Sequence, residues 1–333
     1  VQGIPGVAAS PAGSQSGDVS PAFNHASLSF RTDITEQLSF ALMFDEPVGA
    51  DVNYAGIGAA AGYLYTLGTG SQAEISSRQV TAALRYEFDT GFSVYGGLRG
   101  VTADGNVSLF NGYTMEAEGS DELGYMIGAA YERPNIALRV SLTYYSATTH
   151  DFTATEASGG AGPFNTNFET TVPQQVLLDA QTGVAEGTLV FGSVRWTQWS
   201  DFDITPDLFS DSVPDGNFGD SSLVSYDNDT WTWTVGGARV LTDNWTVLGG
   251  LTYEAQQDGF SGNLGPTNGR TSLGLGARYS QGPLRVQAGV SYSWIGDAQT
   301  EAPSALGAPA GTQFATFEDN DAIGVNLQIG YQF

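Results

Sequence analysis

The last eleven residues of the chain alternate strictly between two kinds of side chain. Apolar residues stand at every odd position, from Ile323 to Phe333, and small or polar residues stand at every even position between them. Successive side chains of a β-strand point to opposite faces, so this segment predicts a strand with one apolar and one polar face. An aromatic residue at its very end favours a strand that borders lipid and closes a ring of strands.

The same alternation recurs in segments of about 12–16 residues, longer than an ordinary strand of ~5–6 residues and suited to a tilted crossing of a bilayer. The polar face of these segments holds Arg85, Arg99, Arg139, Arg278 and Arg285. An Arg that faces lipid at the bilayer midplane costs ~2–4 kcal/mol, so this sorting predicts apolar faces turned outward and polar faces that enclose an interior. A soluble pair of sheets would instead pack the apolar faces against each other.

Short and long joints alternate between these segments, as periplasmic turns and extracellular loops do in outer-membrane barrels. We therefore predict an all-β fold, a transmembrane antiparallel β-barrel that forms a single domain over residues 1–333. We expect about thirteen spans, near residues 22–31, 37–47, 73–88, 92–104, 120–132, 136–148, 170–183, 188–203, 226–240, 244–256, 269–280, 284–296 and 318–333. Bacterial barrels have even strand numbers, so we expect a parent of fourteen strands whose first strand is missing here, with residues 1–20 as an extracellular loop.

Composition excludes several classes of function. The chain carries 36 acidic residues against 11 basic ones, all of them Arg, and nucleic-acid binding needs the opposite balance. It has no Cys, two His and no G-x-S-x-G, H-E-x-x-H or phosphate-loop motif, so nothing indicates an enzyme, a metal site or a cofactor. His150, beside Asp151, is interpreted as a loop histidine. The aspartates of residues 201–229 predict a solvated surface or, alternatively, one where divalent cations bridge to lipopolysaccharide.

One stretch resembles a known family. Residues 172–202, VPQQVLLDAQTGVAEGTLVFGSVRWTQWSDF, are similar to the FadL family of outer-membrane transporters of hydrophobic compounds. The family pattern, P-x-x-hydrophobic followed by W-x-x-W/F-S-x-F, is matched by Pro173, Trp196, Trp199, Ser200 and Phe202. Segments 232–254 and 269–294 are similar too, so the resemblance covers about residues 20–333.

The resemblance implies a fourteen-stranded barrel, plugged by an N-terminal hatch, in the outer membrane of a Gram-negative bacterium. It implies passive transport of long-chain fatty acids or similar molecules, which are captured between extracellular loops and released sideways where the third strand kinks. The implied partners are a hydrophobic ligand (a fatty acid or a detergent), membrane lipid and lipopolysaccharide, with no nucleic acid and with the protein as a monomer. We expect the hatch and the first strand to be missing from this sequence.

Residues 54–67, YAGIGAAAGYLYTL, are unusually apolar for an exposed loop. Either they fold over the barrel mouth and bury themselves, or they form one wall of a capture groove, since exposed apolar patches usually mark binding sites. That wall would consist of Ile57, Tyr63, Leu64, Tyr65 and Leu67. Phe164 and Phe168, in the next long loop, would form the opposite wall.

Pro47 is the candidate for the kink in the wall, because a Pro removes a hydrogen-bond donor from the ladder. It lies in the second span, which would be the third strand of the parent. The alternative is a Pro that simply ends a strand. The lumenal Arg residues either hold a ligand carboxylate or pair with acids such as Glu87 and Glu132.

The leading hypothesis is therefore passive transport of hydrophobic molecules. Two alternatives stay open at this point. One is a water-filled diffusion porin with an acidic mouth, and the other is a structural or adhesive barrel whose loops bind cations.

Overall fold

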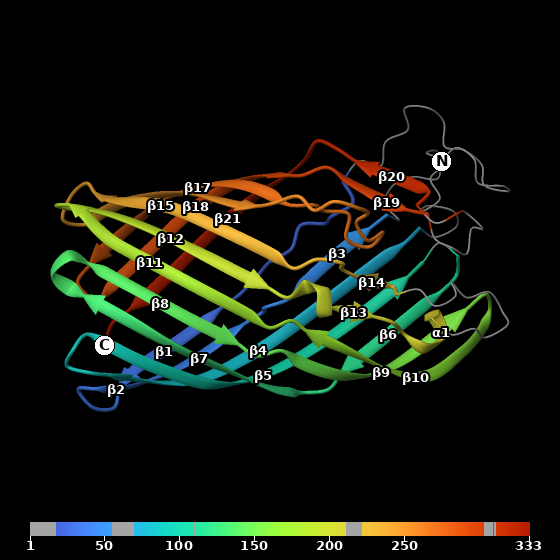
Figure 1. The fold of residues 1–333 in the computed structure, drawn as a ribbon, viewed down its shortest axis with the longest axis horizontal. Coiled ribbons are helices and arrows are strands. Elements are labelled where there is room, and N and C mark those ends of the chain that lie inside the picture. The colour runs from blue at the N-terminus through green and yellow to red at the C-terminus, as the bar shows by residue number, and fades with distance from the viewer. Residues whose placement is uncertain (1–17, 55–69, 110, 211–221, 303–308, 310) are drawn as a thin grey trace.

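The computed structural model describes residues 18–54, 70–109, 111–210, 222–302, 309 and 311–333. Long antiparallel strands wrap into a barrel with short turns at one end and long extensions at the other, and the C-terminus lies at the end with the short turns (Figure 1). No helix among the described residues is long and apolar enough to cross a membrane.

Thirteen strands, each paired antiparallel with the next, form the wall. They are β1 (Leu28–Asp33), β2 (Leu38–Asp45), β4 (Gln72–Glu87), β5 (Phe92–Ser108), β7 (Glu122–Arg133), β8 (Leu138–Tyr145), β11 (Gln175–Ala185), β12 (Thr188–Thr197), β15 (Thr230–Val240), β16 (Trp245–Glu254), β17 (Arg270–Gln281), β18 (Leu284–Ile295) and β21 (Asn320–Tyr331). These strands confirm the expected spans, although their ends differ by several residues. Among the described residues, β1 pairs only with β2, and β21 pairs only with β18. The rings of Phe30 on β1 and Phe333, two residues after β21, lie 6.5 Å apart.

Beyond the wall, a second set of strands extends the barrel at its long-loop end. β6 (Thr114–Gly119) pairs with the last residues of β5 and with β9 (Thr148–Ser158), and β9 pairs with β10 (Ala161–Val172). The smaller elements are β3 (Gly49–Asn53), β13 (Asp203–Ile204), β14 (Val224–Ser225), β19 (Ala298–Glu301), β20 (Gln313–Phe317), α1 (Asp207–Ser210) and the 3₁₀ turns Pro134–Ile136 and Trp199–Asp201.

The prediction of a long loop over residues 148–170 was wrong, because this segment forms the hairpin β9–β10. Phe164, Phe168 and His150 therefore lie on strands. The strands were missed because their outward positions are polar, as at Asp151 and Glu169, and so carry no lipid-facing signal.

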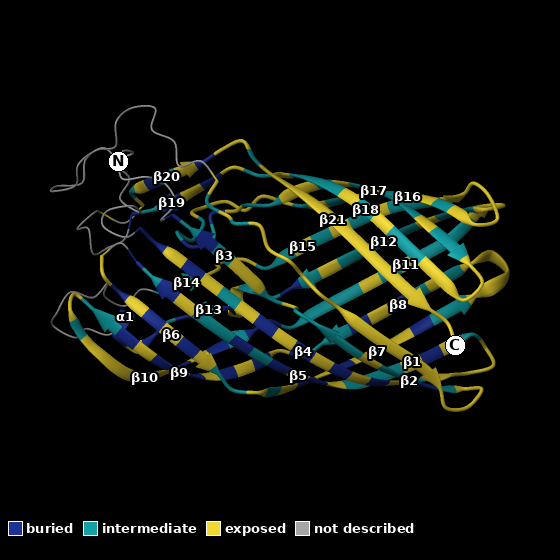
Figure 2. Cartoon of the chain, turned by 180° about the vertical axis from the view of Figure 1, so that it is seen from behind, coloured by how far each residue is buried: buried dark blue, intermediate teal, exposed yellow. Residues whose placement is uncertain are grey.

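Burial shows which face of the wall is outside. Leu98 on β5 is 60% exposed, whereas the next residue, Arg99, is 6% exposed. On β4, the outward Leu84 is exposed while Thr81 and Ala83 point inward and are buried. Figure 2 shows this alternation of exposed and buried positions along the strands. The apolar faces are thus turned outward, which excludes two sheets stacked on their apolar faces.

The outward face of β4 also marks where the apolar band ends. Its exposed side chains are apolar from Tyr86 to Val80 and polar from Arg78 onward, at Ser76 and Glu74. Because lipid tolerates apolar side chains and excludes charged ones, the outer boundary of the bilayer lies between Val80 and Arg78.

A β-bulge interrupts the wall at this boundary. Asp45 on β2 is opposite Gln79, and Gly49 on β3 is opposite Ser76, so the three residues 46–48 face two residues of β4. The Ser77 hydroxyl replaces ladder bonds by accepting from the Val48 N–H at 2.8 Å and donating to the Val48 carbonyl at 2.6 Å. Pro47 stands in the middle of this bulge, where no ladder donor is required.

Arginine substitutions on the outward face of β4 test the boundary. Leu84→Arg places a charge in the apolar band and should destabilise the folded barrel by ~2–4 kcal/mol, whereas Ser76→Arg, beyond the band, should cost ~0–1 kcal/mol. Urea titrations of the two variants in lipid vesicles measure the difference. Equal costs would contradict the assigned boundary.

A candidate binding cavity at the extracellular mouth

A cavity of about 2120 Å³ occupies the inside of the barrel at its long-loop end. Its inner wall comes from β4, β5, β6, β9 and β10, and its other walls come from residues 197–204, 223–232 and 254–270. Much of the lining belongs to one buried apolar cluster, which includes Val107, Met115, Phe152, Phe168, Ile204 and Leu264. Ligand pockets usually measure ~300–1,000 Å³, so this space is a vestibule that a ligand can enter and not a closed site.

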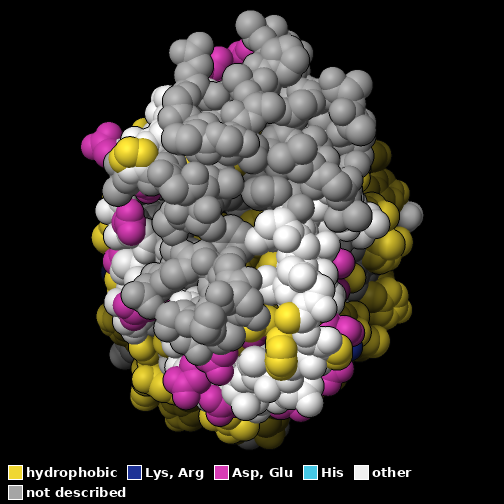
Figure 3. Space-filling view, turned by 90° about the vertical axis from the view of Figure 1, so that its right-hand side faces the viewer, with side chains coloured by type: hydrophobic (Ala, Val, Ile, Leu, Met, Phe, Trp, Pro, Cys, Tyr) yellow, Lys and Arg dark blue, Asp and Glu magenta, His cyan; other side chains and the backbone are white. Residues whose placement is uncertain are grey.

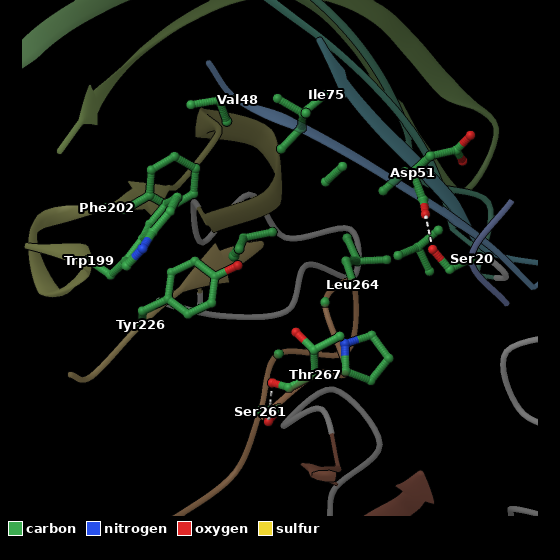
Figure 4. Close-up of a pocket in the computed structure, with 18 of the residues that line it drawn as sticks. Ser20, Val48, Asp51, Ile75, Trp199, Phe202, Tyr226, Ser261, Leu264 and Thr267 are labelled. Carbon is green, nitrogen blue, oxygen red and sulfur yellow. Dashed lines mark hydrogen bonds between the residues drawn. The ribbon is translucent and has the colours of Figure 1, made fainter. Parts of the chain in front are cut away.

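Three aromatic residues form one side of this cavity. The ring centroids of Trp199, Phe202 and Tyr226 lie 5.3–5.8 Å apart, with tilted or edge-to-face geometry. Figure 4 shows this aromatic trio on one side of the cavity, with Val48 drawn beside Phe202 and Ile75 farther along the lining. Tyr226 is 39% exposed, so part of its ring is available to a ligand.

Asp229 holds the chain segment that presents Trp199 and Phe202. The carboxylate accepts from the Trp196 indole N–H at 3.0 Å, and from the Ser200 hydroxyl at 2.6 Å and backbone N–H at 3.3 Å. These bonds favour the charged form, and the pKa of Asp229 is lowered chiefly by the Ser200 hydroxyl. Trp196 and Ser200 thus anchor the 3₁₀ turn from which Trp199 and Phe202 reach the cavity.

A second carboxylate, which is buried, holds the middle of the connection between β12 and β15. Glu156 is fully buried and accepts from the Tyr113 hydroxyl at 2.7 Å, the Thr166 hydroxyl, and the backbone N–H groups of Leu208 at 3.3 Å and Phe209 at 3.2 Å. Burial, and then the bond to this carboxylate, raise the pKa of Tyr113. Glu156 therefore ties α1 to β9, β10 and the residue preceding β6.

The cavity also reaches the bulge in the wall. Residues 46–49 line it, together with Phe23 and His25 from the segment before β1. The ladder between β1 and β2 ends at Leu28 opposite Phe44, so next to the bulge this irregular segment takes the place of a neighbouring strand. It is held there by the Glu46 carboxylate, which accepts from the Ala26 N–H at 3.1 Å.

The structure separates the predicted groove residues. Ile57, Tyr63, Leu64, Tyr65 and Leu67 lie outside the described residues. Phe168 is 8% exposed, stacks on Phe152 with centroids 5.0 Å apart and lines the cavity. Phe164 is 45% exposed and is not among the residues that line it.

The lumenal arginines lie away from the cavity and contact groups of the wall. Arg85 and Arg139 both reach Glu132, at 2.8 and 3.5 Å, and Arg85 lies 3.5 Å from Glu87. Arg99 donates to the side-chain oxygen of Gln79 and to the backbone carbonyl of Ser146, the residue after β8. The others lie near the short-turn end, Arg278 donating to Gln287 and Arg285 standing opposite Ser280.

His150 has a structural place on β9. It is fully buried, its Nδ1 donates to the Ser120 carbonyl at 3.1 Å, and its Nε2 lies 3.1 Å from the Thr148 hydroxyl. Among the described residues, no group of three or more His, Asp or Glu is arranged to hold a metal ion.

Comparison with known proteins decides the family. Residues 5–333 match the family described as outer membrane protein transport protein (OMPP1/FadL/TodX). The chain belongs to this family. It is therefore an outer-membrane protein that transports hydrophobic compounds, and its family is one of channels and not of enzymes. A search of curated protein sequences finds no match.

Solved structures support the same fold. A FadL homologue from Pseudomonas aeruginosa matches with a TM-score of 0.68 at 16% identity, over 91% of this chain and 75% of that one. The toluene transporter TodX from Pseudomonas putida matches at 0.59 and 11% identity, over 93% and 82% of the two chains. The toluene transporter TbuX from Ralstonia pickettii matches at 0.58 and 13% identity, over 92% and 80%. Identities this low show the fold alone.

Sequence reasoning missed the aromatic trio as a site. Trp199 and Phe202 carried the family resemblance, but nothing local distinguished them from residues at a membrane boundary. Tyr226 was hidden at the edge of a long acidic loop. The available signal was the spacing of Trp196, Trp199 and Ser200, because two of these residues share Asp229.

Replacing Glu156 by Gln tests whether it holds α1. The amide has the same size as the carboxylate, but an NH₂ donor replaces one of its two acceptor oxygens. Buried donors that bonded to this oxygen then lose their acceptor, which costs about 1–3 kcal/mol of stability for each donor. We expect hydrogen exchange at the Leu208 and Phe209 amides to accelerate by roughly ten- to a hundredfold. Glu169→Gln, at an exposed position on β10, is the control. Unchanged exchange in Glu156→Gln would show that the carboxylate does not hold α1.

Proposed function

We propose that the protein captures a hydrophobic molecule in the mouth cavity, against the aromatic trio, and releases it sideways through the bulge into the outer membrane. One observation carries the proposal: the trio and the bulge border the same cavity. A ligand could therefore pass from one to the other without crossing the polar lumen below.

The physical basis is the transfer of apolar surface out of water at each step. Burying apolar area contributes about 25 cal/mol per Å², and aromatic pairs add ~0.5–1.5 kcal/mol each. Trp199, Phe202 and Tyr226 supply such contacts on one side, and Val48, next to Pro47, supplies one where the cavity meets the bulge. Release at the boundary between Val80 and Arg78 delivers the molecule to the edge of the apolar band.

The groove residues predicted from the sequence extend this proposal outward. Ile57, Tyr63, Leu64, Tyr65 and Leu67 would receive the molecule first, because their segment follows Tyr54, whose ring is buried next to the cavity and lies 6.4 Å from that of Phe317. Phe168 would contact the ligand inside the cavity, and Phe164 would belong to its rim.

Two ligand classes are compatible with such a cavity. The similar TodX and TbuX proteins are described as toluene transporters, and CymD as a monoaromatic hydrocarbon channel. Rings of that size fit an aromatic trio. Long-chain fatty acids, the other class that the family resemblance implies, would have to extend along the cavity toward the bulge.

Trp199→Ala tests the capture site. Loss of the indole should weaken binding of radiolabelled toluene or palmitate roughly fivefold, since removing one aromatic contact costs about 1 kcal/mol. Trp231→Ala is the matched control, because Trp231 is exposed on the outer face and stacks on Trp233. Binding is measured on protein in lipid nanodiscs. If both variants bind like the parent, the trio is not the site.

Deletion of Pro47 tests the exit. Removing one of the three bulge residues restores two-against-two pairing with β4 and should close the bulge. We expect uptake by cells whose outer membrane otherwise excludes the compound to fall at least tenfold, while binding in nanodiscs persists. Uptake equal to that of the parent would rule out release at this place, and steady ion conductance in planar bilayers would instead favour a diffusion porin.

A further inference from the structure

The charged lining of the cavity is strongly one-sided. Among the described residues that line it, twelve are acidic and only three, Arg78, Arg195 and Arg270, are Arg. Acidic side chains also recur around the described rim of the mouth (Figure 3). The residues outside the described ranges add no base, because all eleven Arg of the chain lie within those ranges.

Each of the three lining arginines has an acidic neighbour. Arg78 stands on the outward face of β4, at the edge of the cavity, and lies 3.4 Å from Asp104 with its side chain 68% exposed. Arg270 stands directly opposite Glu254 in the ladder between β16 and β17. Arg195 lies diagonally across from Asp179 on the same face of β11 and β12. An entering carboxylate would therefore meet many negative charges. It would also have to compete with an acidic side chain of the protein for each of the three arginines.

The aromatic side of the cavity makes a different demand on a ligand. Trp199 and Phe202 offer apolar surface, and the Tyr226 hydroxyl has no hydrogen-bond partner among the described residues. An uncharged molecule with an apolar body and one hydroxyl or carbonyl group satisfies both features. An anion would lose hydration on entering and gain no matching charge.

We propose that the acidic lining is a charge filter, so that the cavity takes uncharged hydrophobic molecules and rejects organic anions such as fatty-acid carboxylates. This inference rests on the proposed function, since it concerns ligands of the same cavity. Repulsion by solvent-exposed charges is screened by salt, with a Debye length of about 30 Å at 0.01 M and about 8 Å at 0.15 M. The filter should therefore weaken as salt rises.

Three probes with one ring system test the filter on the protein in nanodiscs of uncharged lipid at pH 7. They are 2-naphthalenemethanol, which is uncharged, 2-naphthoate, which is an anion, and 2-naphthylmethylammonium, which is a cation. Equilibrium dialysis at ~10 and ~300 mM salt gives the affinities under weak and strong screening. We expect the anion to bind at least tenfold more weakly than the alcohol at low salt, with a smaller gap at high salt and no such penalty for the cation.

A pair of substitutions identifies the source of the effect. Asp227→Asn with Asp258→Asn removes two exposed carboxylates of the lining and should narrow the gap between anion and alcohol severalfold at low salt. Glu118→Gln with Glu169→Gln removes two exposed carboxylates that do not line the cavity and should narrow the gap much less.

The outcomes separate the two proposals. If the alcohol binds and the anion binds as tightly, the filter is wrong and the capture site stands. If the anion and the cation are rejected equally, the barrier is loss of hydration, and the acidic lining is not a filter. If the alcohol does not bind at all, the capture site itself is wrong, and the filter fails with it.

Discussion

Lipid outside the wall is the constraint on which the rest of the structure depends. A bilayer accepts neither charged side chains nor unpaired backbone groups, so every wall strand turns its apolar side chains outward and pairs its backbone with its neighbours. Polar residues are left for the interior, where Arg85 and Arg139 share Glu132. The same constraint explains where the wall can be irregular. The bulge at Pro47 lies at the outer boundary of the apolar band, and the Ser77 hydroxyl satisfies the Val48 backbone there.

Above the bilayer, carboxylates organise an apolar site. Glu156 on β9 binds the backbone of α1, and Asp229 binds the turn that carries Trp199. Both carboxylates accept hydrogen bonds from neighbouring protein groups. They therefore affect the cavity by positioning the segments that they bind. The acids of the cavity lining, by contrast, are exposed or half-buried, so their charge acts on whatever enters. In this protein a high acidic content therefore serves both architecture and selection.

The strands that border lipid could be predicted from the sequence. Most of the structure that extends beyond the bilayer could not. All thirteen wall strands follow from alternation, because each has a face that must be apolar. The hairpin β9–β10 does not, because Phe152 and Phe168 alternate with outward polar residues and the pattern matches an ordinary polar loop.

The site was hidden for a related reason. It is assembled by contacts between distant segments, such as Glu156 with Phe209 and Ser200 with Asp229, and a single sequence does not display such pairings. Trp199 and Phe202 were visible as part of a family motif. The direction in which their side chains point depends on Asp229, which follows Trp199 by 30 residues in the sequence. Phe168 was predicted as a groove residue on composition alone, and its place in the cavity depends on a strand that was not predicted.

The location of a bound hydrophobic molecule tests the central claim most directly. Crystals of the protein soaked with 4-bromotoluene would show bromine by its anomalous scattering. The account predicts a bromine peak in contact with the rings of Trp199, Phe202 and Tyr226, inside the mouth cavity. Bromine found only in the polar lumen near Arg85 and Arg139, with none beside the aromatic trio, would contradict it.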